Sequence, residues 1–106
     1  MRYNEINGFL TMHIITQKRI TEAKKSYPDC NPALVGWLKV AENNEFRNFA
    51  DLKKIFNSVD KVDHLFVFNI GGNKLRLIAS IHFDRQRLYI RHILTHKEYD
   101  KGKWRE

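Results

Sequence analysis

The hydrophobic periodicity of this chain changes near Leu65, and that change limits the folds open to it. Before this point, apart from one short strand, apolar residues recur every three or four positions, which is typical of amphipathic helices. After it they recur at every second position, which is typical of strands with one buried face. Helices followed by strands predict an α+β fold, in which a small antiparallel sheet packs one face against the N-terminal helices.

Three helices are predicted in the first part. The first follows a short strand, Met12–Thr16, whose last residue is expected to be the N-cap, and it ends before Pro28, because the residue preceding a proline resists the α conformation. The second begins with Asn31 as a capping residue and Pro32 in the first turn, and the third begins at Asn48. The residues expected to face the core are Ile20, Ala23 and Tyr27, then Leu34, Trp37, Leu38 and Ala41, then Leu52, Ile55 and Phe56.

Three strands are predicted in the second part. They are Leu65–Ile70, Lys74–Phe83 and Arg87–Thr95, joined by turns at Gly71–Asn73 and Asp84–Gln86. Connections this short join neighbouring antiparallel strands, so the three form a meander.

Strand alternation divides these residues between two faces. Leu75, Leu77, Ala79, Ile81, Phe83, Leu88, Ile90 and Leu94 are assigned to the core face. Lys74, Arg76, Ile78, Ser80, His82, Tyr89, Arg91, Ile93 and Thr95 are assigned to the opposite face, for which no helix remains as a cover. The pattern therefore predicts Arg76 and Arg91 on one uncovered basic surface, with a cluster of His96, Lys97 and Tyr99 at its rim.

Charge and composition narrow the partners. The chain carries a formal charge of +7, and residues 71–106 hold 9 basic but only 4 acidic residues. This cationic third predicts a polyanionic partner such as RNA, DNA or an acidic protein, although solubility alone also explains it. The single cysteine, Cys30, is typical of a reducing cytoplasm, and we expect no membrane span and no secretory signal.

The residues of this surface match the needs of RNA cleavage without a metal. That reaction requires a base for the 2′-hydroxyl, an acid for the leaving oxygen, and cations for the charged phosphorane. Arg76, Arg91, His96, Lys97 and Tyr99 include groups suited to each role. The same residues also have plain structural interpretations, as solvated cations or as a plug at the sheet edge. Alternation and composition therefore leave cleavage and simple binding both open.

No metal or cofactor is predicted. His96 and Asp100 lie four residues apart, but no second pair of ligands has recognisable spacing. The Gly71–Asn73 turn joins two strands and precedes no helix, so it is not a phosphate-binding loop.

Several segments resemble the HigB toxins, a branch of the RelE-like toxin superfamily. The resemblance runs from Met12 to about Gly102, and it is strongest in the FNIGGNKLR hairpin and in the THKEYD ending. It implies a RelE-like fold over residues 12–102 of a single domain, 1–106, with residues 1–11 as an N-terminal extension.

The resemblance also implies a function. It implies the toxin of a type II toxin–antitoxin system, a ribosome-dependent mRNA endoribonuclease that enters the ribosomal A site, contacts rRNA and cuts mRNA by 2′-hydroxyl attack. A HigA-type helix-turn-helix antitoxin would inhibit it, and operator DNA would be bound only through that complex. Alternatives are a non-catalytic RNA- or ribosome-binding module and a degenerate toxin that acts only as a co-repressor.

Residue by residue, the resemblance implies a catalytic group and a binding group. Arg76 would clamp the transition state, and His96, Tyr99 and Lys97 would supply acid–base, stacking and charge-stabilising functions. Asn73, Lys74 and Arg91 would hold RNA phosphates.

Overall fold

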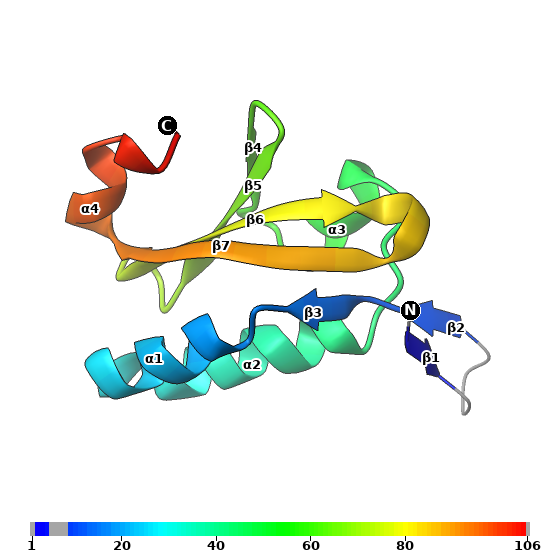
Figure 1. Cartoon of the computed structure of the whole chain (residues 1–106), viewed down its shortest axis with the longest axis horizontal. Coiled ribbons are helices and arrows are strands. Elements are labelled where there is room, and N and C mark those ends of the chain that lie inside the picture. The colour runs from blue at the N-terminus through cyan, green and yellow to red at the C-terminus, as the bar shows by residue number, and fades with distance from the viewer. Residues whose placement is uncertain (1, 5–8, 106) are drawn as a thin grey trace.

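The computed structural model describes residues 2–4 and 9–105, with side chains from residue 11 onward (Figure 1). The strands are β1 (Arg2–Asn4), β2 (Phe9–Thr11), β3 (His13–Ile15), β4 (Asp60–Val62), β5 (Leu65–Ile70), β6 (Leu75–His82) and β7 (Arg87–Thr95). The α-helices are α1 (Lys18–Ser26), α2 (Asn31–Glu42), α3 (Phe49–Ile55) and α4 (His96–Asp100). Short 3-10 turns occupy Pro28–Cys30, Phe83–Arg85 and Lys103–Arg105.

The predicted α+β architecture is confirmed, with two additions to the sheet: β3, and β4, which was not predicted and pairs antiparallel with β5. The strand order of the sheet is β3-β7-β6-β5-β4, and the predicted β5–β6–β7 meander is antiparallel. β3 joins the outer edge of β7 in parallel, so the five-stranded sheet is mixed rather than purely antiparallel. β1 and β2, within the expected extension, pair with each other in a separate two-stranded sheet.

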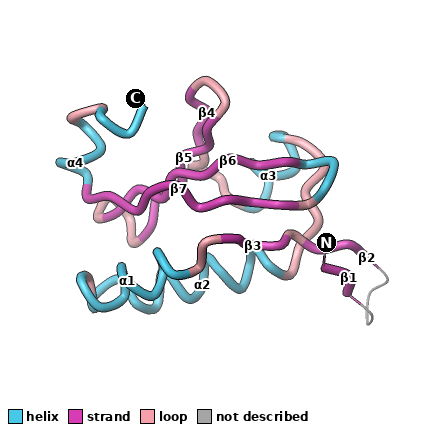
Figure 2. The backbone as a smooth tube through the Cα atoms, viewed as in Figure 1, coloured by secondary structure: helices cyan, strands magenta, loops and turns pink. Residues whose placement is uncertain are grey.

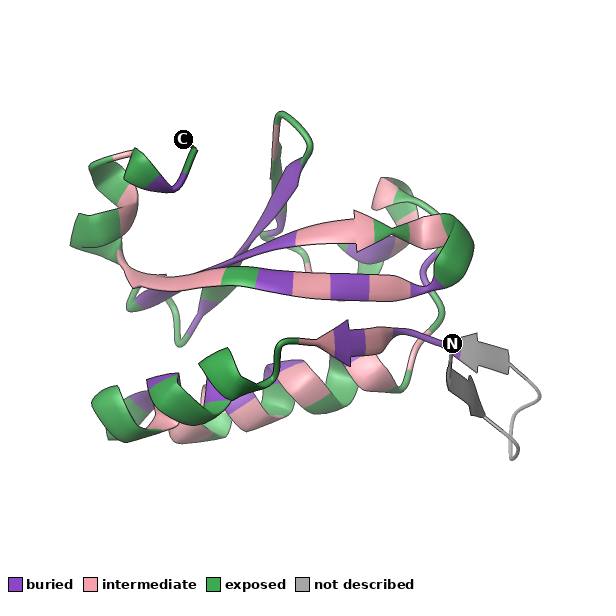
Figure 3. Ribbon diagram, in the orientation of Figure 1, coloured by how far each residue is buried: buried purple, intermediate pink, exposed green. Residues whose placement is uncertain are grey.

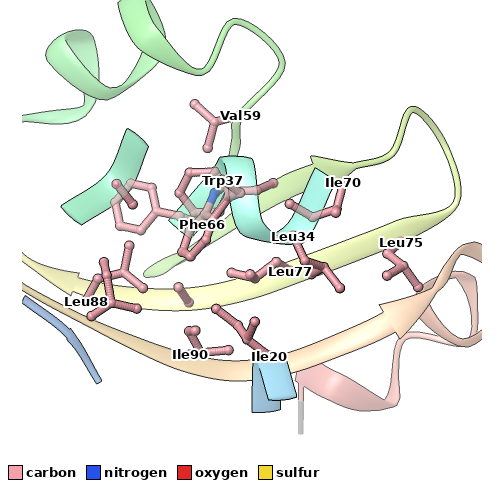
Figure 4. Close-up of a cluster of buried hydrophobic side chains, with 14 of the residues drawn as sticks. Ile20, Leu34, Trp37, Val59, Phe66, Ile70, Leu75, Leu77, Leu88 and Ile90 are labelled. Atoms are coloured by element: carbon pink, nitrogen blue, oxygen red, sulfur yellow. The ribbon is translucent and has the colours of Figure 1, made fainter. Parts of the chain in front are cut away.

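The main core lies between the sheet and the first three helices. α1 and α2 run together along one side of the strands, as Figure 2 shows. Their buried side chains include Ile20 and Leu34, which pack with Leu77 of β6 and Ile90 of β7 in one cluster (Figure 4). Removing this apolar surface from water is the main stabilisation expected for a domain of this size.

The helix ends were predicted in part. α1 ends before Pro28, and Asn48 caps α3 by accepting a hydrogen bond from the Asp51 amide at 2.9 Å, as expected. The other two N-cap predictions were wrong. Thr16 has a φ of 71°, and Gln17 is the N-cap of α1. Cys30 is the N-cap of α2, and Asn31 is the first residue of that helix.

Of the residues expected to face the core, Ile55 was assigned wrongly. Its side chain is 47% exposed, because α3 has only seven residues and Ile55 is the last of them. Gln86, predicted only as a turn residue, is buried. Its side-chain amide bonds both the amide and the carbonyl of Phe46, which ties the β6–β7 turn to the segment before α3.

A β-bulge in β7 changes the predicted faces. Ile78 of β6 lies opposite His92, but the next residue, Ala79, lies opposite Ile90, so Arg91 has no partner in β6. An inserted residue reverses the alternation of everything beyond it. Ile93 therefore packs on the main core and Leu94 on the other face, the reverse of the prediction.

The second face of the sheet is not uncovered, contrary to the sequence prediction. Leu65, Val67 and Ile78 form a second buried cluster there, and Trp104 covers it. The chain turns back after α4 (Figure 1). Trp104 belongs to the C-terminal 3-10 turn that follows. No helix among the described residues has the length and apolar character to cross a membrane.

Candidate functional site

Arg76 is the charged residue with the least exposed side chain in the described part of the chain. It lies in the middle strand β6, opposite Asn69 of β5 and Leu94 of β7, and is only 8% exposed. Its guanidinium donates to the Leu75 carbonyl at 3.3 Å and to the Asn73 side-chain oxygen at 3.4 Å. A guanidinium is always charged, so these neutral partners hold its position without cancelling its charge.

The guanidinium begins a column in which two stacked aromatic rings lie between two arginine cations. Arg76 lies 5.7 Å from the centre of the Tyr99 ring, and Tyr99 stacks on Trp104 at 5.0 Å with an interplanar angle of 13°. The indole Nε1 donates to the Tyr99 carbonyl at 2.9 Å. The guanidinium of Arg105 lies 5.1 Å from the centre of the Trp104 ring, and the π-system of that ring attracts its positive charge.

A capping box holds α4 at the end of β7. The Thr95 hydroxyl accepts from the Glu98 amide at 3.2 Å, and the Glu98 carboxylate accepts from the Thr95 amide at 3.0 Å. The Thr95 hydroxyl also donates to the Glu98 carboxylate at 3.1 Å. Donation from the Thr95 amide and then from its hydroxyl, with a smaller contribution from the charge of Lys101, lowers the pKa of Glu98. A helix of five residues cannot be stable by propagation, so the cap determines where Tyr99 points.

His96 and Asp100 form a pair on the outside of α4. The His96 Nδ1 lies 2.9 Å from a carboxylate oxygen of Asp100, and both side chains are more than half exposed. A carboxylate at this distance accepts the Nδ1–H and selects the tautomer with Nε2 as the nitrogen available to a ligand. The pair therefore presents one oriented imidazole nitrogen to solvent.

Most of the predicted site residues come together. Asn73 and Tyr99 both contact Arg76. Since Leu75 pairs with Thr95, the residues before β6 and after β7 lie at the same end of the sheet, which places Lys74 near the start of α4. His96 and Lys97 belong to that first turn and are exposed. Figure 3 shows that most of the α4 ribbon is exposed.

Arg91 lies elsewhere on the same face of the sheet. As the bulged residue it has no partner in β6, and it lines a groove with Ser80, His82 and Tyr89, which were predicted on that face, and with Trp104. We call this the basic groove. This groove has a volume of about 1040 Å³. It is lined by Thr16, Arg19, His64, Leu65, Ser80, Ile81, His82, Tyr89, Ile90, Arg91, His92, Trp104 and Arg105.

The sequence did not point to Trp104, Arg19 or Arg105. Trp104 lies in no periodic segment, so only its size and apolar character, which favour burial, could have marked it. Arg19 and Arg105 are single cations on an α-helix and a 3-10 turn, and their convergence depends on the tertiary fold.

The described residues contain no cluster of three or more His, Cys, Asp or Glu side chains arranged to hold a metal ion. The side chains of the site have the chemistry of a phosphate-binding surface with an oriented imidazole. Arginine forks bind phosphate oxygens, stacked rings bind bases, and histidine transfers protons near neutral pH.

Comparison with known proteins agrees with this chemistry. Residues 30–102 match the HigB_toxin family, described as the RelE-like toxic component of a toxin–antitoxin system. The mRNA interferase toxin HigB of Escherichia coli strain K12 is 41% identical over 92 residues, covering 84% of this chain and 88% of that protein. The mRNA interferase HigB of Shigella flexneri has the same identity and coverage, and that of Escherichia coli O6:H1 is 33% identical over 93 residues, covering 85% of this chain and 90% of that protein.

Proposed function

The chain belongs to the HigB toxin family, the RelE-like toxic component of toxin–antitoxin systems, and we propose that it is an endoribonuclease that cleaves mRNA. The names of its relatives as mRNA interferases support this activity. The observation that carries the proposal is the Arg76 guanidinium, held in the sheet by neutral partners and covered by the Tyr99 ring.

The proposed reaction is attack by the 2′-hydroxyl on the adjacent phosphorus. A base removes the 2′-hydroxyl proton, the O2′–P bond forms, the P–O5′ bond breaks, and an acid protonates the leaving 5′-oxygen. The products are a 2′,3′-cyclic phosphate and a 5′-hydroxyl end, so no water and no metal are required. Because charge builds on the phosphorane oxygens, a fixed cation beside them stabilises the transition state more than the substrate.

Arg76 is the proposed clamp for that charge. Its neutral hydrogen-bond partners leave the guanidinium charge uncompensated, and its burial keeps it in one position. A fixed dipole or charge needs no reorganisation during the reaction, which is why such contacts are worth about 2.7–4 kcal/mol in other enzymes. Tyr99 covers the guanidinium and is proposed to orient the neighbouring base by stacking.

His96 is proposed to transfer a proton, with its available Nε2 directed by the bond from Nδ1 to Asp100. Lys97, in the same turn, is proposed to stabilise the charged phosphate. Asn73 and Lys74, in the turn before β6, are proposed to hold the phosphate next to the scissile one. Whether His96 acts as the base or as the acid depends on which side of the phosphorus the 2′-oxygen approaches.

The membership in a toxin–antitoxin family implies an antitoxin partner. We propose that this antitoxin is of the HigA type, that the complex binds operator DNA through it, and that cleavage takes place on mRNA in the ribosomal A site. The formal charge of +7 supports binding to the ribosome, which is rich in RNA. A basic protein is attracted to RNA phosphates whatever the base sequence.

The test is a reconstituted translation reaction in which mRNA ends are mapped by primer extension. Wild-type protein is expected to produce new 5′-hydroxyl ends on translated mRNA. The same ends are expected when a metal chelator is added at a concentration that leaves the ribosomes intact. Intact mRNA at toxin levels equal to those of ribosomes would refute the proposal. Salt-sensitive RNA binding without new ends would instead favour a binding module.

A further inference from the structure

We propose that the basic groove binds a second segment of the same single-stranded RNA, adjoining the segment held at Arg76. This inference rests on the proposed function, since it adds a contact surface to that site. The groove volume of about 1040 Å³ is at the upper limit of the roughly 300–1,000 Å³ typical of small-molecule sites. A space of this size suits an extended ligand better than a single metabolite.

The charges in the groove are all of one kind. Its lining contains three arginines, Arg19, Arg91 and Arg105, and three histidines, His64, His82 and His92, but no aspartate or glutamate. Burial, followed by the charges of Arg19 and Arg91, lowers the pKa of His92, as expected where positive potential is concentrated. A polyanion is the ligand that this potential favours.

The bulge in β7 creates the arginine arrangement. β3 pairs with β7 only at Arg87–Tyr89, so the edge of β7 is open to α1 beyond that point. Arg19 of α1 fills the opening and donates its Nε to the Ile90 carbonyl at 3.2 Å, immediately before the bulged Arg91. In the described part of the chain the two terminal nitrogens of Arg19 have no protein partner. They leave a planar pair of donors, the geometry that binds phosphate oxygens in bidentate fashion.

Aromatic rings in the same groove favour RNA over an acidic peptide. Tyr89 is half-buried, and its ring contacts that of His82 in a T-shaped arrangement at 5.5 Å. A base can stack on such a supported ring without ordering it first, and stacking is worth about 1–3 kcal/mol per base. An acidic peptide would use the arginines but gain little from these rings.

Trp104 connects the groove to the site at Arg76. Its ring lines the groove and also stacks on Tyr99, which covers the Arg76 guanidinium. Arg105 belongs to the groove and lies over the same indole. The column of two stacked rings between two arginines therefore runs from one site to the other, and such a combination of cations and rings is typical of surfaces that bind single strands.

The test uses the full chain freed from its antitoxin and a fluorescent 2′-O-methyl RNA of about 12 nucleotides, which lies within the usual site sizes for single strands. The 2′-O-methyl group removes the attacking hydroxyl, so binding is measured without cleavage. The double variant Arg19→Ala, Arg91→Ala is expected to bind at least 10-fold more weakly in fluorescence anisotropy. The slope of log affinity against log salt should fall by about 1.4, since each phosphate contact on a single strand contributes about 0.7.

Arg47→Ala is the matched control, because Arg47 is an exposed arginine outside the groove. Its replacement removes one positive charge, as each of the two groove substitutions does. The Arg47→Ala variant should bind like the wild type. Tyr89→Phe should retain the affinity that Tyr89→Ala loses. Unchanged binding by the double variant would overturn the inference, as would equal losses per charge in Arg47→Ala or no binding by the wild type. Equal affinity for an oligoglutamate of the same charge would also overturn the assignment to RNA.

The failure of this inference and that of the proposed function have different signatures. If the wild type binds the oligonucleotide through Arg19 and Arg91 but produces no new mRNA ends on ribosomes, the groove stands and the nuclease proposal fails. If mRNA is cut but the double variant binds and cuts as the wild type does, the groove is wrong and the nuclease proposal stands.

Discussion

The Arg76 guanidinium lies 5.7 Å from the centre of the Tyr99 ring, although the two residues belong to a central strand and to the last α-helix. The contact joins the most buried described cation to a helix held in place by a single capping box. It is the structural basis of the proposed active site, and each part of it can be changed separately.

Replacing Arg76 by lysine tests the clamp. Lys keeps the charge but loses the planar fork and its stacking on Tyr99, so we expect a reduction in the cleavage rate on the order of 100-fold or more. The rate is measured by primer extension on translated mRNA, and folding is checked by thermal unfolding. Arg85→Lys, at an exposed turn outside both sites, should cut normally. A normal rate in Arg76→Lys would contradict the proposed role.

Removing the histidine pair in two steps tests proton transfer. His96→Ala should lower the rate by about 100-fold or more, the contribution expected of a general acid or base. Asp100→Ala should lower it less, because the imidazole remains but is no longer oriented by the 2.9 Å contact. The measurement is the pH dependence of cleavage in single-turnover reactions. A fully active His96→Ala variant would show that His96 is a surface residue with no part in proton transfer, whatever the effect of Asp100→Ala.

Truncating Trp104 tests the cover of the second face. Trp104 is 6% exposed and packs on Leu65, Val67 and Ile78, so Trp104→Ala should reduce the free energy of unfolding by about 3 kcal/mol. Trp104→Phe retains a ring for Tyr99 but loses the 2.9 Å hydrogen bond, and should cost only about 1 kcal/mol. Chemical denaturation measures both values. An Ala variant as stable as the wild type would show that the C-terminal turn does not cover this face.

Thr95→Ala tests whether the capping box positions Tyr99. The loss of an N-cap costs about 1 kcal/mol, which is enough to unfold a helix of five residues while leaving the sheet intact. We expect faster amide exchange in α4 and slower cleavage, with little change in the melting temperature. Thr95→Ser, which keeps the hydroxyl, should behave like the wild type. Normal amide protection in Thr95→Ala would exclude this dependence.

His92 should make stability depend on pH. Its pKa is lowered in the folded protein, so the unfolded chain binds more protons between the unfolded pKa of about 6.5 and the lower folded value. The contribution of His92 is therefore fully present above pH 6.5 and is lost as the pH falls through that window. Among the other titratable groups facing it, Arg19 and Arg91 stay charged throughout, and Glu98, Lys101 and Lys103 lie in the adjoining pocket. Denaturation of His92→Gln from pH 7.5 to 5 should show a flatter curve than the wild type, and parallel curves would contradict the prediction.

The sequence by itself determined the order and type of the main elements, α1 to α3, β3 and β5 to β7, but not the short β1, β2, β4 and α4. Period and turn chemistry are local properties, and they correctly predicted β7 as Arg87–Thr95, the glycine turn after β5 and the Asn48 cap. Asn73 contacts Arg76 because it lies in the turn just before β6, and Tyr99 contacts Arg76 because it follows the end of β7, which pairs with the start of β6.

Only the tertiary structure decided the faces and the cover of the sheet. The bulge at Arg91 depends on how β7 pairs with β6, and strict alternation cannot reveal an inserted residue, so Ile93 and Leu94, which follow it, were assigned to the wrong faces. Trp104 covers a cluster whose members lie far away in the sequence. Such contacts depend on the packing of distant segments, and no local pattern contains that information.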